Sequence, residues 1–178
     1  RGLGDVYKRQ GLGGRLDAMN LVDPDISVVL PIALDHQEYL GDSREQIGAE
    51  KAGILRPGQP AVVGDPDPPQ SLVQAAQSAS VAAHYGKEFG WEGNRLWWSK
   101  DGQILEAKLD APKLPPTSLA AAMQTAAMLS WPVTPITLPS LELLGRQTTV
   151  QVGGKTVLLD VAHNPHAVER LKERISEW

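Results

Sequence analysis

The turn Leu159–His166, which reads Leu-Asp-Val-Ala-His-Asn-Pro-His, constrains this chain more than any other feature. It follows an apolar, β-branched run at Thr156–Leu159 and precedes an amphipathic run at Ala167–Ile175. This order predicts a strand that passes directly into a helix. Pro165 suits the first helical position, and Asn164 suits the cap before it. In open α/β sheets, ligands bind at such carboxyl ends of strands.

The polar residues of this turn fit an anionic ligand. Three of them, an acid, an imidazole and an amide, lie together in the sequence: Asp160, His163 and Asn164. These groups suit a polyanion such as a nucleotide. Taken alone, they also fit an ordinary capped turn without a ligand.

Composition excludes several classes of protein. The chain has 178 residues, 42% hydrophobic residues and a formal charge of −4, which fits one globular domain, or one domain with part of another. No apolar run approaches the roughly 18 residues that cross a bilayer. The N-terminus lacks the apolar core of a secretory signal, so we expect a cytoplasmic protein without a membrane partner. The absence of cysteine excludes disulfides and thiolate metal sites, and a mildly acidic balance without basic clusters argues against a nucleic-acid partner.

The rest of the pattern alternates between strands and helices. An apolar run at Ile26–Leu30 predicts a strand, and Ser43 with Gln46 three residues later has the pattern of a helix capping box. We then expect, in order, a strand at Ala61–Gly64, a loop at Asp65–Pro69, a helix at Ser71–Ala79, an antiparallel meander from His84 to Asp110 and a helix at Thr117–Leu129.

The last part of the chain predicts a domain boundary and a hairpin. Three prolines indicate the approach to the boundary: Pro132, Pro135 and Pro139. Beyond them, Gly153-Gly154 joins two expected strands, Thr148–Val152 and Thr156–Val161.

Four blocks of sequence, in this order, resemble the motifs of a known family. They are Gly11-Leu-Gly-Gly-Arg-Leu-Asp-Ala-Met-Asn20, Leu34-Asp-His-Gln-Glu-Tyr-Leu-Gly41, Gly48-Ala-Glu-Lys-Ala-Gly-Ile54 and Asp160–Pro165. Together they resemble the folylpolyglutamate synthases, and most closely the bacterial bifunctional dihydrofolate synthase/folylpolyglutamate synthases of the Mur ligase superfamily. The resemblance runs from Gly11 to Trp178.

The resemblance implies an α/β fold in two parts. The first is part of a Mur-ligase-type central ATPase domain, with a mostly parallel sheet, flanking helices and a small antiparallel meander. The second is the first strand and helix of a Rossmann-like C-terminal domain.

Two departures from the family pattern shape the expected domain organisation. Residues 1–10 fit nothing that follows, so we interpret them as a non-native segment; a divergent N-terminus is the alternative. The Gly-Lys-Ser or Gly-Lys-Thr phosphate loop of a Mur-type ligase does not occur in the sequence. We therefore expect a fragment, with residues 11–139 from the later half of the central ATP-binding domain. Residues 140–178 would be the junction and the start of the C-terminal glutamate ligase domain.

His36 is a candidate catalytic residue and metal ligand. It follows the expected strand at Ile26–Leu30 and has Asp35 beside it. A single histidine is more often structural, and Mg²⁺ prefers oxygen ligands. The resemblance nevertheless implies that His36 binds Mg²⁺, as the histidine of this block does in the family.

Lys51 is the second candidate for both roles. On a helix that starts at Ser43, it shares an apolar stripe with Ile47 and Ile54, where an unpaired ammonium group is costly. A lysine whose stem covers the core and whose ammonium reaches solvent is the alternative. The resemblance implies that Lys51 is carbamylated and that the carbamate helps to hold Mg²⁺.

The first block supplies the candidate substrate-binding residues. The resemblance implies that Leu16, Asp17 and Ala18 lie beside the pterin-bearing substrate, with Asp17 as its hydrogen-bond partner. A tight strand-to-helix connection is the alternative explanation for the glycines. The family's acidic metal ligand would stand two residues before Gly11, where this chain has Arg9, so one magnesium site is broken.

The junction supplies the candidate ATP-binding residues. Arg146 matches the arginine of the family's Pro-Gly-Arg, with Leu144 in place of proline, and its planar guanidinium suits phosphate or ribose. A solvated linker residue is the alternative. The resemblance implies that Asp160 and His163 also contact ATP, beside Asn164. The family's adenine-binding asparagine is Ser118 here, and that contact is in question.

The activity that the resemblance implies is ATP-dependent amide-bond formation. ATP phosphorylates the carboxylate of dihydropteroate or of a folate glutamyl tail, and the amine of glutamate then displaces phosphate, with Mg²⁺ as cofactor. The expected partners are ATP, glutamate and dihydropteroate or folate, and the expected oligomeric state is a monomer. Three alternatives are another Mur-type amino-acid ligase, a catalytically inactive fragment, and, with least support, a metal-dependent hydrolase built on His36.

Overall fold

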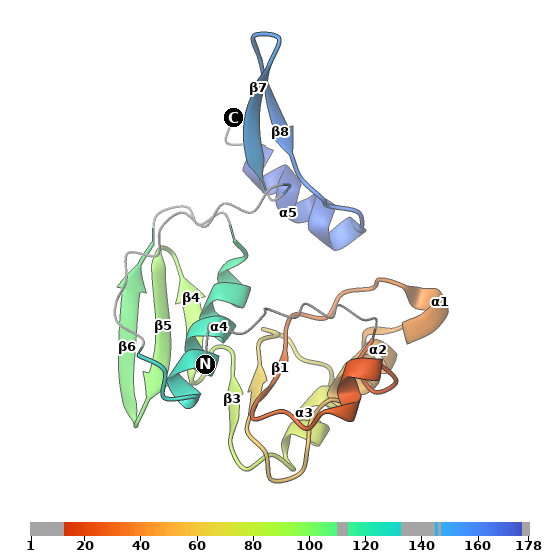
Figure 1. Cartoon of the computed structure of the whole chain (residues 1–178), viewed down its shortest axis with the longest axis vertical. Helices are drawn as coiled ribbons and strands as arrows, with labels where there is room; N and C mark the ends of the chain where they lie inside the picture. Colours follow the sequence, from red (N-terminus) through yellow and green to blue (C-terminus); the bar gives the residue numbers. More distant parts are fainter. Residues whose placement is uncertain (1–12, 110–113, 133–144, 146, 176–178) are drawn as a thin grey trace, which may run out of the picture.

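The computed structural model describes residues 13–109, 114–132, 145 and 147–175. Three short strands form a parallel sheet in the order β1 (Ser27–Val29), β2 (Ala61–Val63), β3 (Ala82–His84). A 3-10 helix precedes β1, two helices connect β1 to β2, and one connects β2 to β3 (Figure 1). These helices are η1 (Ala18–Leu21), α1 (Gln37–Leu40), α2 (Arg44–Ala52) and α3 (Gln70–Ala76).

The central strand β2 is buried on both of its faces. Side chains alternate along a strand, so Val63 packs in one core cluster with Ile47 of α2 and Leu72 of α3. Val62 packs in a second cluster that contains Trp98 and Ala120. A short apolar strand buried on both faces is typical of a parallel sheet covered on both sides.

Most of the buried residues of the second cluster come from an antiparallel meander and one helix. The strands β4 (Phe89–Glu92), β5 (Arg95–Lys100) and β6 (Gln103–Lys108) are neighbours in that order. Helix α4 (Pro116–Met128) lies against β4 and β5 and also contacts β2 (Figure 1). The buried amide of Gln124 bonds the backbone N–H and C=O of Ser99 at 2.9 and 3.2 Å, which satisfies a polar side chain inside this core.

The last described segment is a hairpin followed by a helix. β7 (Thr148–Val152) pairs with β8 (Lys155–Leu159) in antiparallel fashion, and α5 (Pro165–Ile175) follows. Gly153 and Gly154 both have positive φ, the backbone that two-residue hairpin turns need and that glycine adopts at low cost. The predicted α/β fold with a meander, a hairpin and a final helix is thus confirmed.

Some predicted details were wrong or lie outside the described residues. Ala82–His84 pairs with β2 as a strand, whereas the meander was predicted to begin at His84. Helix α3 ends at Ala76 rather than Ala79, because Ser78 turns back and donates its hydroxyl to Ala75 O. Residues 1–10, Pro135 and Pro139 are not among the described residues. No helix in the described part of the chain is long and apolar enough to span a bilayer.

Candidate functional site

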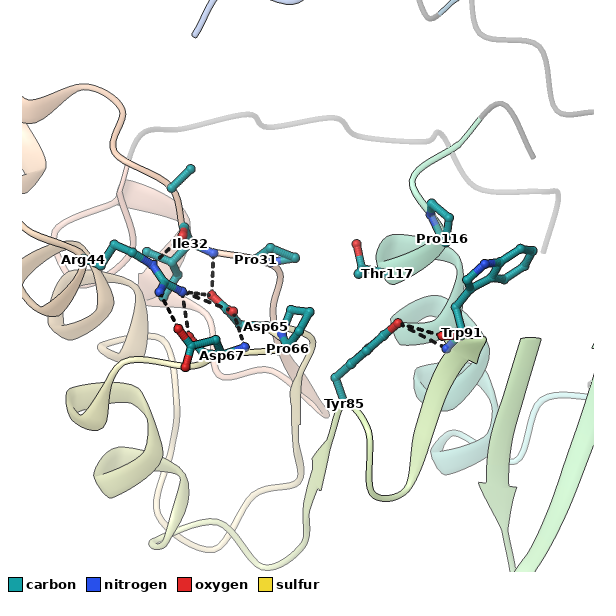
Figure 2. Close-up of a pocket in the computed structure, with 11 residues that line it drawn as sticks. Pro31, Ile32, Arg44, Asp65, Pro66, Asp67, Tyr85, Trp91, Pro116 and Thr117 are labelled. Atoms are coloured by element: carbon teal, nitrogen blue, oxygen red, sulfur yellow. Dashed lines mark hydrogen bonds and ion pairs between the residues drawn. The ribbon is translucent and has the colours of Figure 1, made fainter. Parts of the chain in front are cut away.

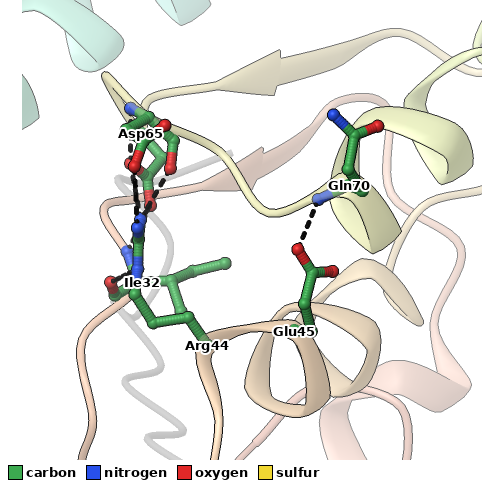
Figure 3. Close-up of polar contacts among 6 residues, drawn as sticks. Ile32, Arg44, Glu45, Asp65 and Gln70 are labelled. Atoms are coloured by element: carbon green, nitrogen blue, oxygen red, sulfur yellow. Dashed lines mark hydrogen bonds and ion pairs between the residues drawn. The ribbon is translucent and has the colours of Figure 1, made fainter.

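An ion pair between a buried aspartate and a partly exposed arginine lies at the carboxyl edge of the parallel sheet. Asp65, two residues after the end of β2, is 4% exposed, and its carboxylate accepts the N–H groups of Ile32 and Asp67 at 2.7 and 2.9 Å. Arg44, the first residue of α2, donates to Asp65 at 3.1 Å and to Ile32 O at 3.0 Å (Figure 3). Burial opposes the charge of Arg44, but the carboxylates of Asp67 and Asp65 raise its pKa above the ordinary value.

An open cavity of about 650 Å³ lies between this edge and the start of α4. One wall carries Arg44 and Asp65, and the other carries Tyr85, Trp91 and Thr117 (Figure 2). The hydroxyl of Tyr85 accepts the backbone N–H of Trp91 at 3.2 Å, which fixes the aromatic wall. The cavity therefore combines a charged side with an apolar, aromatic side.

The glycine-rich first block is packed directly against the end of α2. A Cβ on Gly14 would lie 2.5 Å from Glu50 O and 2.8 Å from Lys51 Cα, so only glycine fits there without movement. Arg15 donates its backbone N–H to Glu50 O at 2.8 Å and its guanidinium to the Glu50 carboxylate at 2.7 Å. Asn20 donates to Gly53 O at 3.0 Å. The predicted substrate segment and the Lys51 helix thus form one packed unit.

The predicted substrate-binding residues have different environments in this unit. Leu16 and Ala18 are exposed, and Leu16 has 79% of its surface accessible. Asp17 is half-buried, and its Oδ1 accepts the N–H of Met19 at 2.8 Å at the start of η1. Asp17 also lines a cavity of about 230 Å³ together with Gly14.

Lys51 lies in the last turn of α2 and is half-buried. The prediction that it shares a helical stripe with Ile54 was wrong, because α2 ends at Ala52. Ile47, one turn before Lys51, is buried as predicted. Within the described residues, the Lys51 ammonium has no hydrogen-bond or ion-pair partner.

His36 meets residues from the far end of the chain. It adopts a left-handed backbone, with φ 48° and ψ 42°, as the cap of α1, and Asp35 Oδ1 accepts its N–H at 2.8 Å. The ligand atoms of Asp35, His36 and His163 lie within 4.8 Å of one another. Asp35 and His163 were not predicted as neighbours of each other, although both stand in blocks that the sequence singles out.

The predicted nucleotide-binding residues lie in the β8–α5 turn, which is held by hydrogen bonds from backbone N–H groups. Asp160 accepts the N–H groups of Ala162 and Gln147 at 2.7 and 3.0 Å. Gly145 O accepts the N–H of Val161 at 2.8 Å. The segment around Arg146 is therefore bonded to this turn on both sides, while Arg146 itself lies outside the described residues.

Asn164 connects this turn to the His36 loop. Its Oδ1 accepts the N–H of Ala167 at 2.8 Å, and its Nδ2 donates to Asp35 Oδ2 at 2.7 Å. The Nε2 of His163 lies 3.7 Å from the same carboxylate oxygen. The Asn164 bond is the main cause that lowers the pKa of Asp35 below its ordinary value; partial burial opposes it, and the His36 N–H and the two imidazoles add to it.

The chain aligns with curated relatives over nearly its whole length. It is 40% identical over 176 residues to the dihydrofolate synthase/folylpolyglutamate synthase of Escherichia coli K12, and the alignment covers 96% of this chain and 42% of that protein. Identity to the Haemophilus influenzae protein of the same name is 31% over 192 residues, with 96% and 44% covered. This chain is a homologue of the dihydrofolate synthase/folylpolyglutamate synthases. No family model matches the chain.

Solved structures of this family share the fold. The structure of E. coli FolC in complex with DHPP and ADP matches with a TM-score of 0.77 and 39% identity, over 94% of this chain and 42% of that one. A bifunctional folylpolyglutamate synthase/dihydrofolate synthase with Mn, AMPPNP and L-glutamate bound matches with a TM-score of 0.75 and 37% identity, over the same shares. The chain thus spans 42% of the length of these relatives, and its Mur-ligase-type fold is confirmed.

Proposed function

We propose that this chain is part of an ATP-dependent ligase that joins glutamate to dihydropteroate or to a polyglutamyl folate. The observation that carries the proposal is the meeting of two family blocks, in which Asn164 bonds Asp35 across 129 positions of sequence. This contact gathers His36, His163 and Asn164 at one place. Relatives that contain ADP or AMPPNP support a nucleotide as one substrate.

The proposed binding roles divide between the β8–α5 turn, which would bind ATP, and the glycine-rich first block, which would bind the pterin-bearing substrate. Asp160, His163 and Asn164 would contact ATP together with Arg146, because a strand-to-helix turn offers a carboxylate, an imidazole and backbone N–H groups to a polyanion. The exposed side chains of Leu16 and Ala18, with the half-buried Asp17, would receive the pterin-bearing substrate. These two segments belong to the two proposed domains, so catalysis would need these domains to close on each other.

The donor set around His36 fits a divalent cation. One carboxylate and two imidazoles, from Asp35, His36 and His163, have ligand atoms within 4.8 Å of one another. The carboxylate suits Mg²⁺, and the imidazoles suit transition-metal ions. We assign Mg²⁺ as the cofactor, with His36 and Lys51 as its protein ligands. Bound there, the ion would neutralise charge on the transferring phosphoryl group.

Carbamylation would turn Lys51 into an oxygen ligand. Its neutral Nζ attacks the carbon of carbon dioxide, a nitrogen–carbon bond forms, and one proton leaves to solvent. A half-buried ammonium without a partner among the described residues is suited to this change, since the carbamate replaces a poorly compensated cation.

The reaction that these roles serve has two steps. A substrate carboxylate oxygen attacks the γ-phosphorus of ATP, and ADP leaves. The amine of glutamate then attacks the acyl carbon, phosphate leaves with the bonding electrons, and a proton is released as the amide forms. Asp160 and His163 would bind and orient the nucleotide during the first step.

The proposal includes the setting of the enzyme. Residues 11–139 would belong to the central ATP-binding domain, and residues 140–178 would form the junction and the start of the glutamate ligase domain. The protein would act as a cytoplasmic monomer on small molecules, without nucleic-acid or membrane partners.

A ligase assay on the protein encoded by the whole reading frame tests the proposal. With ATP, dihydropteroate and glutamate present, we expect dihydrofolate and ADP in equal amounts, and no dihydrofolate without glutamate. Activity only with a cell-wall precursor would replace this function by that of another Mur-type ligase. A His163→Ala variant should raise the KM for ATP, and a His84→Gln variant, which changes an unassigned imidazole, should not.

The 178-residue chain needs its own measurement. Calorimetry with Mg²⁺ and ATP at millimolar concentration would detect a nucleotide site in this part alone. No binding to the chain, together with no ligase activity of the whole protein, would overturn the proposal in favour of an inactive protein.

A further inference from the structure

One carboxylate, that of Asp35, contacts both predicted ligand-binding elements. Its Oδ1 accepts the N–H of His36 at 2.8 Å, and its Oδ2 accepts Nδ2 of Asn164 at 2.7 Å. The imidazole of His163 lies 3.7 Å from Oδ2. Asp35 is therefore bonded on one side to the His36 turn and on the other to the β8–α5 turn.

Asn164 presents its amide to Asp35 in a defined orientation. Its Oδ1 already accepts the N–H of Ala167 at the start of α5, so Nδ2 is the group left to donate. An asparagine side chain has one acceptor oxygen and one donor nitrogen, and both are used. Aspartate at position 164 would keep the helix cap but would place two carboxylates against each other.

We infer that Asp35 is a positioning residue, whose bond to Asn164 holds the nucleotide turn of residues 160–165 next to His36. This inference rests on the proposed function, because it concerns the arrangement of the same site. Asp35 also holds the left-handed backbone of His36, a conformation that non-glycine residues rarely adopt. The hydrogen bond between Asp35 and Asn164 therefore joins two turns that each have a defined conformation.

A reciprocal exchange of the two side chains tests this role. In Asp35→Asn, two amide nitrogens face each other, and in Asn164→Asp, two carboxylates do. The double variant restores the bond with donor and acceptor reversed, because the new amide at position 35 donates to the new carboxylate at position 164. All three variants keep a side-chain oxygen for the N–H groups of His36 and Ala167.

The kinetic result separates positioning from a local structural role. Each single variant should raise the KM for ATP about tenfold and leave the KM for dihydropteroate unchanged. The double variant should return the KM for ATP to within about threefold of wild type. The control Asp42→Asn, which removes an exposed carboxylate between α1 and α2, should leave both values unchanged.

Amide hydrogen exchange supplies a readout that does not depend on catalysis. In the 178-residue chain, residues 162–168 should exchange about tenfold faster in each single variant and at the wild-type rate in the double variant. Unchanged exchange in the single variants, or no recovery in the double variant, would overturn the inference even if the enzyme is a ligase. Recovery of exchange in a protein without ligase activity would keep the bond and overturn only the proposed function.

Discussion

The guanidinium of Arg44 bridges two aspartates that differ in burial. It lies 3.1 Å from the carboxylate of Asp65, whose side chain is 3% exposed, and 3.0 Å from that of Asp67, whose side chain is 93% exposed. The two carboxylates are two residues apart and share one cation. Replacing each aspartate in turn therefore separates the effect of burial from the effect of charge on the stability of the fold.

Replacing Asp65 should destabilise the fold far more than replacing Asp67. We expect Asp65→Ala to lower the free energy of unfolding by about 3 kcal/mol, because it leaves Arg44 without its buried partner and removes the acceptor of two N–H groups. Asp67→Ala should cost less than about 1 kcal/mol, since exposed ion pairs contribute little. Urea unfolding followed by tryptophan fluorescence measures both, and equal losses would contradict the buried role of Asp65.

Glu45 should make stability depend on pH in the acid range. Its carboxylate accepts the N–H groups of Ser71 and Gln70 at the start of α3, and these bonds hold the pKa of Glu45 below its ordinary value. Figure 3 shows the bond from Gln70. A lowered pKa in the folded state stabilises the protein above the unfolded-state pKa, and this contribution is lost as the pH falls through the folded-state pKa.

The variant Glu45→Gln makes that dependence measurable. Its midpoint of urea unfolding should lie below that of wild type at pH 7, and the gap should close as the pH falls below about 4. Glu92→Gln, which removes an exposed carboxylate at the end of β4, serves as the control and should show no such trend. A Glu45→Gln gap that stays constant down to pH 3 would contradict the assignment.

Local chemistry was enough to predict several elements of the fold. The Ser43 cap, the Gly153-Gly154 turn and the Asn164 cap each depend on side chains within a few residues, and the structure has all three. Strand β3 could not be predicted in the same way. Its three residues, Ala82–His84, carry no alternation of their own and become a strand by pairing with β2.

The site was predictable in its parts but not in its assembly. Sequence motifs singled out His36 and His163, yet no spacing rule relates residues so far apart in the chain. The hydrolase alternative had little support because no second ligand lay at helical spacing from His36. The fold instead brings His163 beside His36 and its sequence neighbour Asp35 through a tertiary contact. The burial of Asp65 has the same origin, because Arg44 and Ile32 reach it from other elements.

The close approach of Gly14 to α2 should make it intolerant of a side chain. In Gly14→Ala, the new Cβ would meet the backbone of Glu50 and Lys51, so the first block must move away from the helix. We expect a loss of about 1–3 kcal/mol in the free energy of unfolding. Gly58→Ala is the control, because its Cβ would meet nothing within 4 Å and it would pay only the cost of positive φ, about 1 kcal/mol. A Gly14→Ala loss no larger than that of Gly58→Ala would show that the contact is not tight.

Carbamylation of Lys51 should be visible without any assay of activity. With ¹³C-labelled bicarbonate at neutral pH, we expect one carbamate carbon resonance in the protein encoded by the whole reading frame, and its loss in Lys51→Ala. The half-buried position of Lys51 favours this change, because burial penalises the ammonium form and the carbamate replaces that cation by an anionic oxygen ligand. Lys87→Ala, which removes a lysine from the turn after β3, should keep the resonance. A signal that survives Lys51→Ala would belong to another amine, and full ligase activity of the same variant would remove Lys51 from the proposed metal site.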